Sequence, residues 1–296
     1  MNRAGCIIAA GLMVISLAQA QEPMPIDFDE TGAGGLSFDM NASFLKGATI
    51  KGGSGKVEVS SLDVAWSWSF LSLEYQGKSY NWESASEGPF FPVPEPLWNT
   101  LNTVWLTAGY SNSIDRSLQY SADVDVFASF EREHFGLVGY EVEGALFYSL
   151  PAGWRAYGGM ALHYSPFQTD VYPMLGLRRG VDSEPGWAVV LGIPETKVQY
   201  RVNSRYALAA GVSVLNVDYY LLAMDNVDEH DRYLETSDNR LFLVLNVTPS
   251  KKLQVGVGLQ YTVDNELMFY SENRQNLNSY RLSNVPGLLL QAQYRY

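Results

Sequence analysis

Cysteine and histidine are nearly absent from this chain of 296 residues, and charged residues are few. Cys6 is the only cysteine, and the three histidines, His134, His163 and His230, lie far apart in the sequence. A protein zinc site needs about three or four nitrogen or sulfur ligands close together, so neither a metal site nor a cofactor is expected. Charged residues make up 18% of the chain, below the ~25% that is typical of soluble domains.

Positive charge is especially scarce. The chain has 20 Lys and Arg against 32 Asp and Glu, and its formal net charge is −12. Nucleic-acid binding needs clustered basic residues that neutralise phosphate, so this composition excludes a nucleic-acid partner.

Long hydrophobic runs are also missing. The longest apolar stretch, residues 6–17, follows Arg3 and precedes Ala18-Gln19-Ala20. It is too short for a membrane-spanning helix, which needs ~20 residues, and its order is that of a secretory signal peptide. We therefore expect cleavage after residue 20 and loss of Cys6. Cys6 stands at the start of the apolar run and not at its end, so it does not fit a lipoprotein signal. Residues 21–35 are polar and rich in Gly and Pro, and are expected to form a flexible periplasmic lead-in.

Apolar and polar residues alternate along most of the remaining chain. Because successive side chains of a strand point to opposite faces, this period of two predicts strands with one apolar and one polar face. No segment has a sustained helical period with capping residues. The clearest strand segments are 36–44, 118–130, 206–214 and 252–263.

Strand length favours a membrane barrel over a soluble β-sandwich. Soluble strands average ~5–6 residues, whereas a membrane strand needs ~9–11. Many of the predicted strands are long, and their polar faces are rich in Gly, Ser, Thr, Gln and Asp, as a wet lumen would be. Short connections at 151–153, 203–204 and 248–251 alternate with long ones at 77–99, 222–239 and 264–285, which is typical of periplasmic turns and outer loops.

The fold predicted for residues 36–296 is thus an all-β, antiparallel transmembrane β-barrel of about twelve strands, with ten to fourteen allowed. If both chain ends lie on the periplasmic side, the number of strands must be even. Segments 186–192 and 196–202 are short for membrane strands. Segment 56–76 changes parity, so a bulge or a tight turn is expected near Ser60-Ser61.

The end of the chain resembles the C-terminal assembly signal of Gram-negative outer-membrane proteins. Apolar residues alternate up to Tyr294 and Tyr296, giving the aromatic-x-aromatic ending of that signal, although Phe is the commoner last residue. The resemblance implies outer-membrane localisation and recognition of the last strand by the barrel-assembly machinery.

The middle of the chain is similar to a family of uncharacterised Gram-negative outer-membrane β-barrel proteins, grouped as a domain of unknown function. The similar stretches are Val171-Tyr172-Pro173-Met174-Leu175-Gly176, Trp187, residues 192–196 and residues 200–203. This resemblance implies a fold and a location, but no activity.

Charged residues at positions of lumen parity are the main candidates for function. Acidic side chains outnumber basic ones there, and a ring of one sign selects permeants of the opposite sign. Alternatively, acidic and basic groups pair and fill the interior, as happens in small barrels. The candidates for lumen charge are Asp123, Asp125, Glu141, Glu143, Arg155 and Lys252, together with Asp39 and Arg295.

One pair of residues suggests catalysis. His163 and Ser165 resemble the His-x-Ser pair that outer-membrane phospholipase A and the lipid A deacylase carry on a barrel strand. Two features oppose this interpretation. Leu175 stands where those enzymes have an orienting Glu or Asn, and the pair has lumen parity, away from lipid. An enzyme is therefore the less favoured reading.

The acidic run 225–231 lacks the spacing of a calcium-binding loop, and we expect a solvated outer loop. Bridging by divalent cations to lipopolysaccharide phosphates remains an alternative there. The sequence thus favours an integral outer-membrane barrel, either a narrow channel for small solutes or a structural barrel. The alternatives are a lipid-hydrolysing barrel enzyme that uses His163 and Ser165, and a secreted soluble β-protein.

Overall fold

The structure is a computed structural model that describes residues 36–51, 55–83, 100–131, 134–166, 168–180, 184–193, 196–220, 231–271 and 276–296. These residues form strands and one short 3-10 turn, η2 (Pro151–Gly153). No helix among them is long and apolar enough to cross a membrane. The strands are β1 (Leu36–Thr49), β2 (Lys56–Trp68), β3 (Leu71–Glu83), β4 (Thr100–Ser113), β5 (Leu118–Glu131), β6 (His134–Ser149), β7 (Trp154–Tyr164), β8 (Thr169–Arg179), β9 (Gly186–Ile193), β10 (Thr196–Arg201), β11 (Tyr206–Tyr220), β12 (Asp231–Ser250), β13 (Leu253–Ser271), β14 (Asn276–Leu282) and β15 (Pro286–Arg295).

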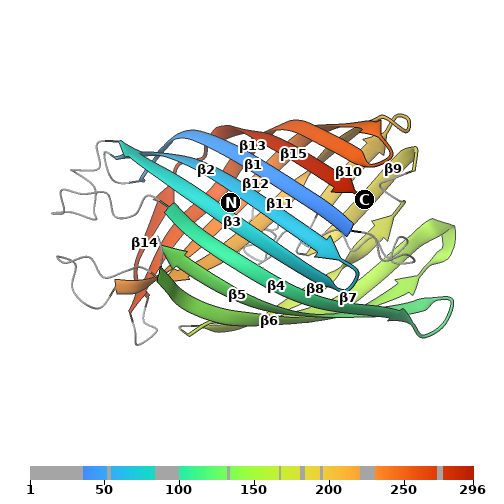
Figure 1. Cartoon of the computed structure of the whole chain (residues 1–296), viewed down its shortest axis with the longest axis horizontal. Coiled ribbons are helices and arrows are strands. Elements are labelled where there is room, and N and C mark those ends of the chain that lie inside the picture. Colours follow the sequence, from blue (N-terminus) through green and yellow to red (C-terminus); the bar gives the residue numbers. More distant parts are fainter. Residues whose placement is uncertain are drawn as a thin grey trace, which may run out of the picture.

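The strands form one closed antiparallel barrel (Figure 1). Each strand from β1 to β13 pairs with the next one in sequence, and β15 pairs with both β13 and β1. β14 and β15 follow one another along β13, separated by residues 283–285, and so act as one interrupted strand. The wall therefore has fourteen strands, as the upper limit of the sequence prediction allowed.

The apolar faces of the strands point outward. On β5, Val124 and Val126 are exposed whereas Ser121, Asp125 and Ser129 are buried, as their alternation predicts. Val257 on β13 is 60% exposed. In a soluble β-sandwich these residues would meet in a core, so the outward apolar face confirms a transmembrane barrel and excludes the soluble alternative.

The expected irregularity at Ser60-Ser61 is wrong. β2 pairs in unbroken register through both residues, and the chain turns later, at Ser69 (φ 54°). The bulge lies instead on the neighbouring β1, between Leu45 and Ala48, where Gly47 has φ 76°. The apolar residues of segment 56–76 change parity because Val57 and Val59 are apolar and yet face inward. The short β9 and β10 are also genuine strands of the wall.

The three predicted short connections, at 151–153, 203–204 and 248–251, lie together at one end of the barrel, as predicted. The predicted long loops are partly wrong, because 77–83 belongs to β3, 231–239 to β12, 264–271 to β13 and 276–282 to β14. Below, the end with these three connections is the turn end and the other is the loop end. Residues 1–35, with the expected signal and lead-in, lie outside the described residues, as do 221–230, with His230 and most of the acidic run.

The outward face can be tested on β13. Replacing Val257 with Arg places a charge against hydrocarbon, which costs ~2–4 kcal/mol near the membrane midplane. We expect Val257→Arg to reduce the folded fraction on insertion into lipid vesicles, measured by heat-modifiable migration in a gel. Gln254→Arg, on the inward face of the same strand, should fold like the parent. Equal folding of the two variants would contradict this assignment of faces.

Candidate functional site in the barrel interior

The interior of the barrel differs between its two halves. Near the turn end, inward side chains such as Asp39, Arg155, Lys197 and Gln293 are partly exposed. Near the loop end, inward side chains are buried, with Leu101 among them. The interior is thus most accessible from the turn end.

Apolar packing fills the loop half. Residues from both sides of the barrel meet there, and β11 comes within 8 Å, between Cα atoms, of β5 and β6, which lie across the barrel in the strand order. Tyr233 and Tyr270 pack against Trp105, Phe127 and Leu137 of the β4–β6 wall. A second cluster joins β1–β4 to β11–β14 and comprises Leu45, Ala48, Ile50, Val57, Val59, Tyr80, Leu101, Tyr219, Leu234, Leu267, Phe269, Leu282 and Val285.

Four predicted lumen carboxylates form a square on the inward face of β5 and β6. Asp123 is the direct cross-strand partner of Glu143, and Asp125 is the partner of Glu141. Asp125 and Glu141 are buried, whereas Asp123 and Glu143 are partly exposed. We call these four residues the acidic square; it lies where the accessible half of the interior meets the packed half.

Polar contacts hold the deeper side of the acidic square. Thr107 donates its hydroxyl hydrogen bond to Asp125, and Nδ1 of His163 lies 3.0 Å from Oε2 of Glu141. The His163 ring also stacks on Phe127, with 5.2 Å between ring centroids. The sequence had not connected His163 with the carboxylates; they meet because Glu141 and His163 are register partners on β6 and β7.

The His163–Ser165 pair lies inside the barrel. Both residues are buried, with exposures of 3% and 0%. β7 ends at Tyr164, so Ser165 follows the strand, and its Oγ accepts a hydrogen bond from the backbone N–H of Gln168 at 3.3 Å. Membrane lipid contacts the outer surface of the barrel, so this position is not that of a residue that attacks lipid.

The predicted basic partners do not lie beside the acidic square. Arg155 faces inward but stands six residues before Ala161, the register partner of Glu143, which is about 20 Å along β7 at ~3.3 Å per residue. Lys252, expected on the lumen face, is exposed in the turn between β12 and β13. Parity alone could not show that the strand begins only at Leu253.

Other basic residues of the interior were missed by the sequence analysis. Arg178 on β8 is the register partner of Arg155, and Lys197 lies in the same row on β10. Arg178 and Arg179 are consecutive, so the sequence did not show which one faces inward. The structure has Arg179 outside, with its guanidinium 5.7 Å from the centre of the Trp154 ring.

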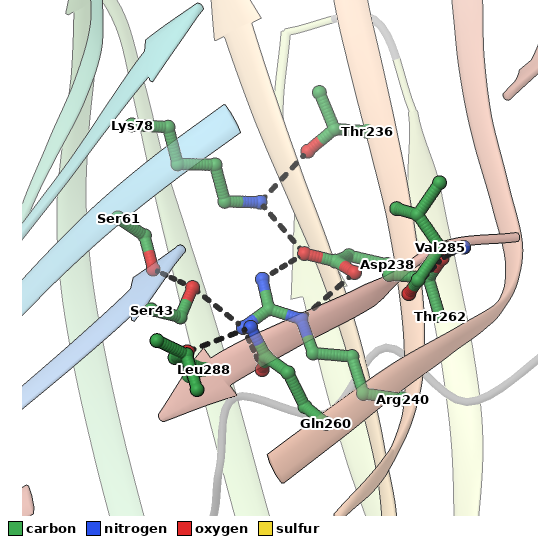
Figure 2. A network of polar contacts seen from close by, with 10 residues as sticks. All are labelled: Ser43, Ser61, Lys78, Thr236, Asp238, Arg240, Gln260, Thr262, Val285 and Leu288. Atoms are coloured by element: carbon green, nitrogen blue, oxygen red, sulfur yellow. Dashed lines mark hydrogen bonds and ion pairs between the residues drawn. The ribbon is translucent and has the colours of Figure 1, made fainter. Parts of the chain in front are cut away.

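A second charged cluster crosses the interior near the loop half (Figure 2). Lys78 on β3 reaches β12, where its Nζ lies 3.9 Å from Oδ2 of Asp238 and donates to Thr236 at 3.4 Å. Arg240 forms an ion pair with Asp238 and donates to Ser43 on β1 at 3.2 Å. Because β3 and β12 are not neighbours in the sheet, these contacts connect separate parts of the wall.

Burial makes this cluster important for stability. The side chains of Lys78 and Asp238 are 2% and 8% exposed. Removing one partner of a buried ion pair leaves an uncompensated charge and typically costs ~3–5 kcal/mol. The cluster was missed because Lys78 lies in the predicted loop 77–99, and Asp238 and Arg240 lie in or beside the predicted loop 222–239.

Tyr294 lies on the closing strand β15, and Tyr296 directly follows it. β15 pairs with β1 and β13, and the backbone N–H of Tyr296 donates to the carbonyl of Leu36 at 2.9 Å. The two rings meet edge to face with 4.7 Å between centroids. Among the described residues, no group of three or more His, Cys, Asp or Glu side chains has a geometry that could hold a metal ion.

Comparison with known proteins yields structural likeness only. No family model matches the chain, so the resemblance to the uncharacterised family is not confirmed, and no curated protein matches it. A KdgM porin in complex with disordered oligogalacturonate aligns with 88% of this chain and 99% of its own at 9% identity and a TM-score of 0.37.

Two solved structures from Pseudomonas putida are also similar. The toluene transporter TodX aligns with 90% of this chain and 91% of its own at 9% identity and a TM-score of 0.41. An outer membrane channel of strain F1 aligns with 94% of this chain and 100% of its own at 11% identity and a TM-score of 0.47. At these values the likeness is limited to the general barrel form, and the proposals below rest on the residues of this chain.

The buried cluster gives a stability prediction. We expect Asp238→Asn to lower the free energy of unfolding by ~3–5 kcal/mol, because Lys78 and Arg240 lose their buried counter-charge. Glu58→Gln is the control, since Glu58 pairs with a largely exposed Lys46 and an exposed pair contributes at most ~1 kcal/mol. Urea unfolding in lipid vesicles measures both. Equal losses would show that the buried cluster carries no special share of the stability.

Proposed function

We propose that the protein is an outer-membrane channel for small solutes, with a charged path in the turn half of the barrel and a packed constriction in the loop half. On this proposal the turn end is periplasmic, because short turns face the periplasm in outer-membrane barrels. Outer-membrane lipid and lipopolysaccharide surround the apolar outer face. Cleavage of the first twenty residues stays a prediction.

The acidic square is the observation that carries this proposal. Like charges on directly opposed residues destabilise a sheet, so the pairs Asp123–Glu143 and Asp125–Glu141 weaken a barrel whose role is only structural. In a channel the same four carboxylates form a site that attracts cations, because the low-dielectric wall focuses their field. Asp123 and Glu143 are partly exposed toward the accessible half, where a solute would meet them.

Catalysis by His163 and Ser165 is not part of the proposal. Both side chains are buried in the interior, and His163 contacts the acidic square through Glu141. These contacts support a role for His163 in positioning Glu141.

Conductance in planar bilayers tests the channel. We expect the refolded protein to conduct small ions with a weak preference for cations, seen as a reversal potential in a KCl gradient. Replacing both Asp123 and Asp125 with Asn removes half of the acidic square and should shift that potential toward zero.

The control for this experiment is Asp115→Asn, which removes a carboxylate from an exposed turn between β4 and β5 and should leave the reversal potential unchanged. A barrel that is folded and inserted but never conducts would overturn the channel proposal. A conducting barrel that is anion-selective, or insensitive to the double substitution, would overturn the role of the acidic square.

We also propose that β15 is the strand that the barrel-assembly machinery recognises. Its support is the position of β15 as the closing strand and the outward, exposed Tyr296 at its end.

Deleting Tyr296 tests this second proposal. We expect slower insertion, seen as accumulation of the variant in the periplasmic fraction with unchanged export. Among the described residues, deletion removes the backbone hydrogen bond to Leu36, so the folded barrel itself should persist. Normal levels in the outer membrane would show that the aromatic ending is not a recognition signal.

A further inference from the structure

A row of polar side chains crosses six neighbouring strands on the inward face of the wall, from β12 through β13, β15, β1 and β2 to β3. Its side chains, which we call the acceptor row, are those of Asn246, Gln291, Asn41, Asp63 and Gln76. On β13 the row passes through Gly256, which has no side chain. Directly opposed residues of a sheet have their Cβ atoms ~5 Å apart, so neighbouring side chains of the row lie within reach of one another.

The acceptor row leads from the turn end toward the packed half of the interior. Barrel strands are tilted by ~35–45° from the axis, so a row of register partners climbs along the barrel. This row starts at Arg201, beside the turn 203–204, and continues past Gln76 to Leu137 in the packed loop half. The middle members, Gln291, Asn41 and Asp63, are partly exposed, so the row can be reached from the accessible half.

Three oxygens of the acceptor row have no hydrogen-bond partner in the described part of the chain. They are Oδ1 of Asn246, Oδ1 of Asp63 and Oε1 of Gln76, and each of these atoms is buried. The residues Asn246 and Gln76 are only 5% and 4% exposed. A buried acceptor without a donor costs stability, and native proteins rarely keep one without a reason. The acceptor row therefore needs an occupant that donates hydrogen bonds.

The oxygens come together in pairs. A Cβ atom on Gly256 would lie 2.7 Å from Oδ1 of Asn246 and 3.2 Å from Oε1 of Gln291, so these two oxygens converge on one point. They are close enough for a single donor nitrogen to bond to both. Asp63 and Gln76 are direct register partners on β2 and β3, which brings their two unpartnered oxygens together in the same way.

Two cations of the protein lie near the upper end of the acceptor row, and both are held by other groups. Lys78 is the next inward residue after Gln76, and its Nζ donates to Thr236 and lies 3.9 Å from Oδ2 of Asp238 (Figure 2). Arg240 pairs with the same Asp238. Neither cation is a hydrogen-bond partner of the unpartnered oxygens, so their donor comes from water or from a solute.

The acidic interior favours a cation as this donor. Asp63 is itself a carboxylate, and the acidic square on β5 and β6 begins two strands from Gln76. Water and hydroxyl groups accept hydrogen bonds as well as donate them, whereas a primary ammonium group has three donors and no acceptor. An ammonium group therefore matches both the charge and the one-sided hydrogen bonding of the acceptor row.

We propose that the acceptor row binds small organic cations that carry N–H donors and leads them from the turn end toward the acidic square. The proposal rests on the channel function and deepens it by naming the class of solute. It fails separately from that function, because binding is measured below without any conduction.

The first test compares two isomeric cations, n-butylammonium and tetramethylammonium. They have the same atoms and the same charge, but only butylammonium has N–H groups. Saturation-transfer NMR on the refolded protein in lipid nanodiscs gives a dissociation constant for each. We expect butylammonium to bind about fivefold more tightly, as one net hydrogen bond provides. Equal binding of the isomers would overturn the proposal and show that water alone serves these oxygens.

The second test removes the unpartnered oxygens without changing charge. Gln76→Met and Asn246→Leu keep the size of the side chain, and together they should abolish the preference for butylammonium. Replacing an unpaired buried amide with an apolar group of the same shape is nearly neutral or stabilising, so the double variant should show normal heat-modifiable migration.

The matched control is Gln119→Leu, which removes an amide of lumen parity from β5, outside the acceptor row. This variant should keep the parent's preference. A preference that persists in the folded double variant, or that Gln119→Leu also abolishes, would overturn the role of the acceptor row.

Conductance in KCl separates this proposal from the channel. A protein that conducts K⁺ but binds the two isomers equally would refute the acceptor row and leave the channel standing. A protein that prefers butylammonium but never conducts would refute the channel and keep the binding site.

Discussion

The structure depends on the requirement that backbone hydrogen bonds be completed inside a membrane. Hydrocarbon offers no partners for N–H and C=O groups, so a sheet can cross it only as a closed ring. The pairing of β15 with both β1 and β13 achieves this closure at the turn end.

Interior charge has two different roles in this barrel. Near the loop half, Lys78, Asp238 and Arg240 neutralise one another and connect strands that are not neighbours, so their charges stabilise the packing. In the acidic square, Asp123, Asp125 and their partners repel one another across adjoining strands. The first arrangement serves the fold, and the second is suited to attracting a solute.

The sequence predicted the fold well where inward side chains are polar and partly exposed. There the alternation of apolar and polar residues reports the two faces directly, as on β5, and the four carboxylates of the acidic square were all assigned to the lumen. It failed where the interior is packed. Val57 and Val59 are apolar and yet face inward, so the sequence pattern indicated a bulge where there is none. The strand extensions at 231–239 and 264–271 contain polar residues, so they were predicted to be loops. The sequence did not predict the buried cluster of Lys78, Asp238 and Arg240, because its contacts join strands that are far apart in sequence.

The seam between β1 and β15 also constrains how the barrel forms. It pairs Ser37 with Arg295, the two extremes of the described chain, whereas almost every other strand pairs with its sequence neighbour. Contacts between distant residues require closure of a long chain loop and form slowly. The cylinder therefore cannot close until β15 has been synthesised. Until then β1 and β13 each present an open edge, and open strand edges can pair with other chains.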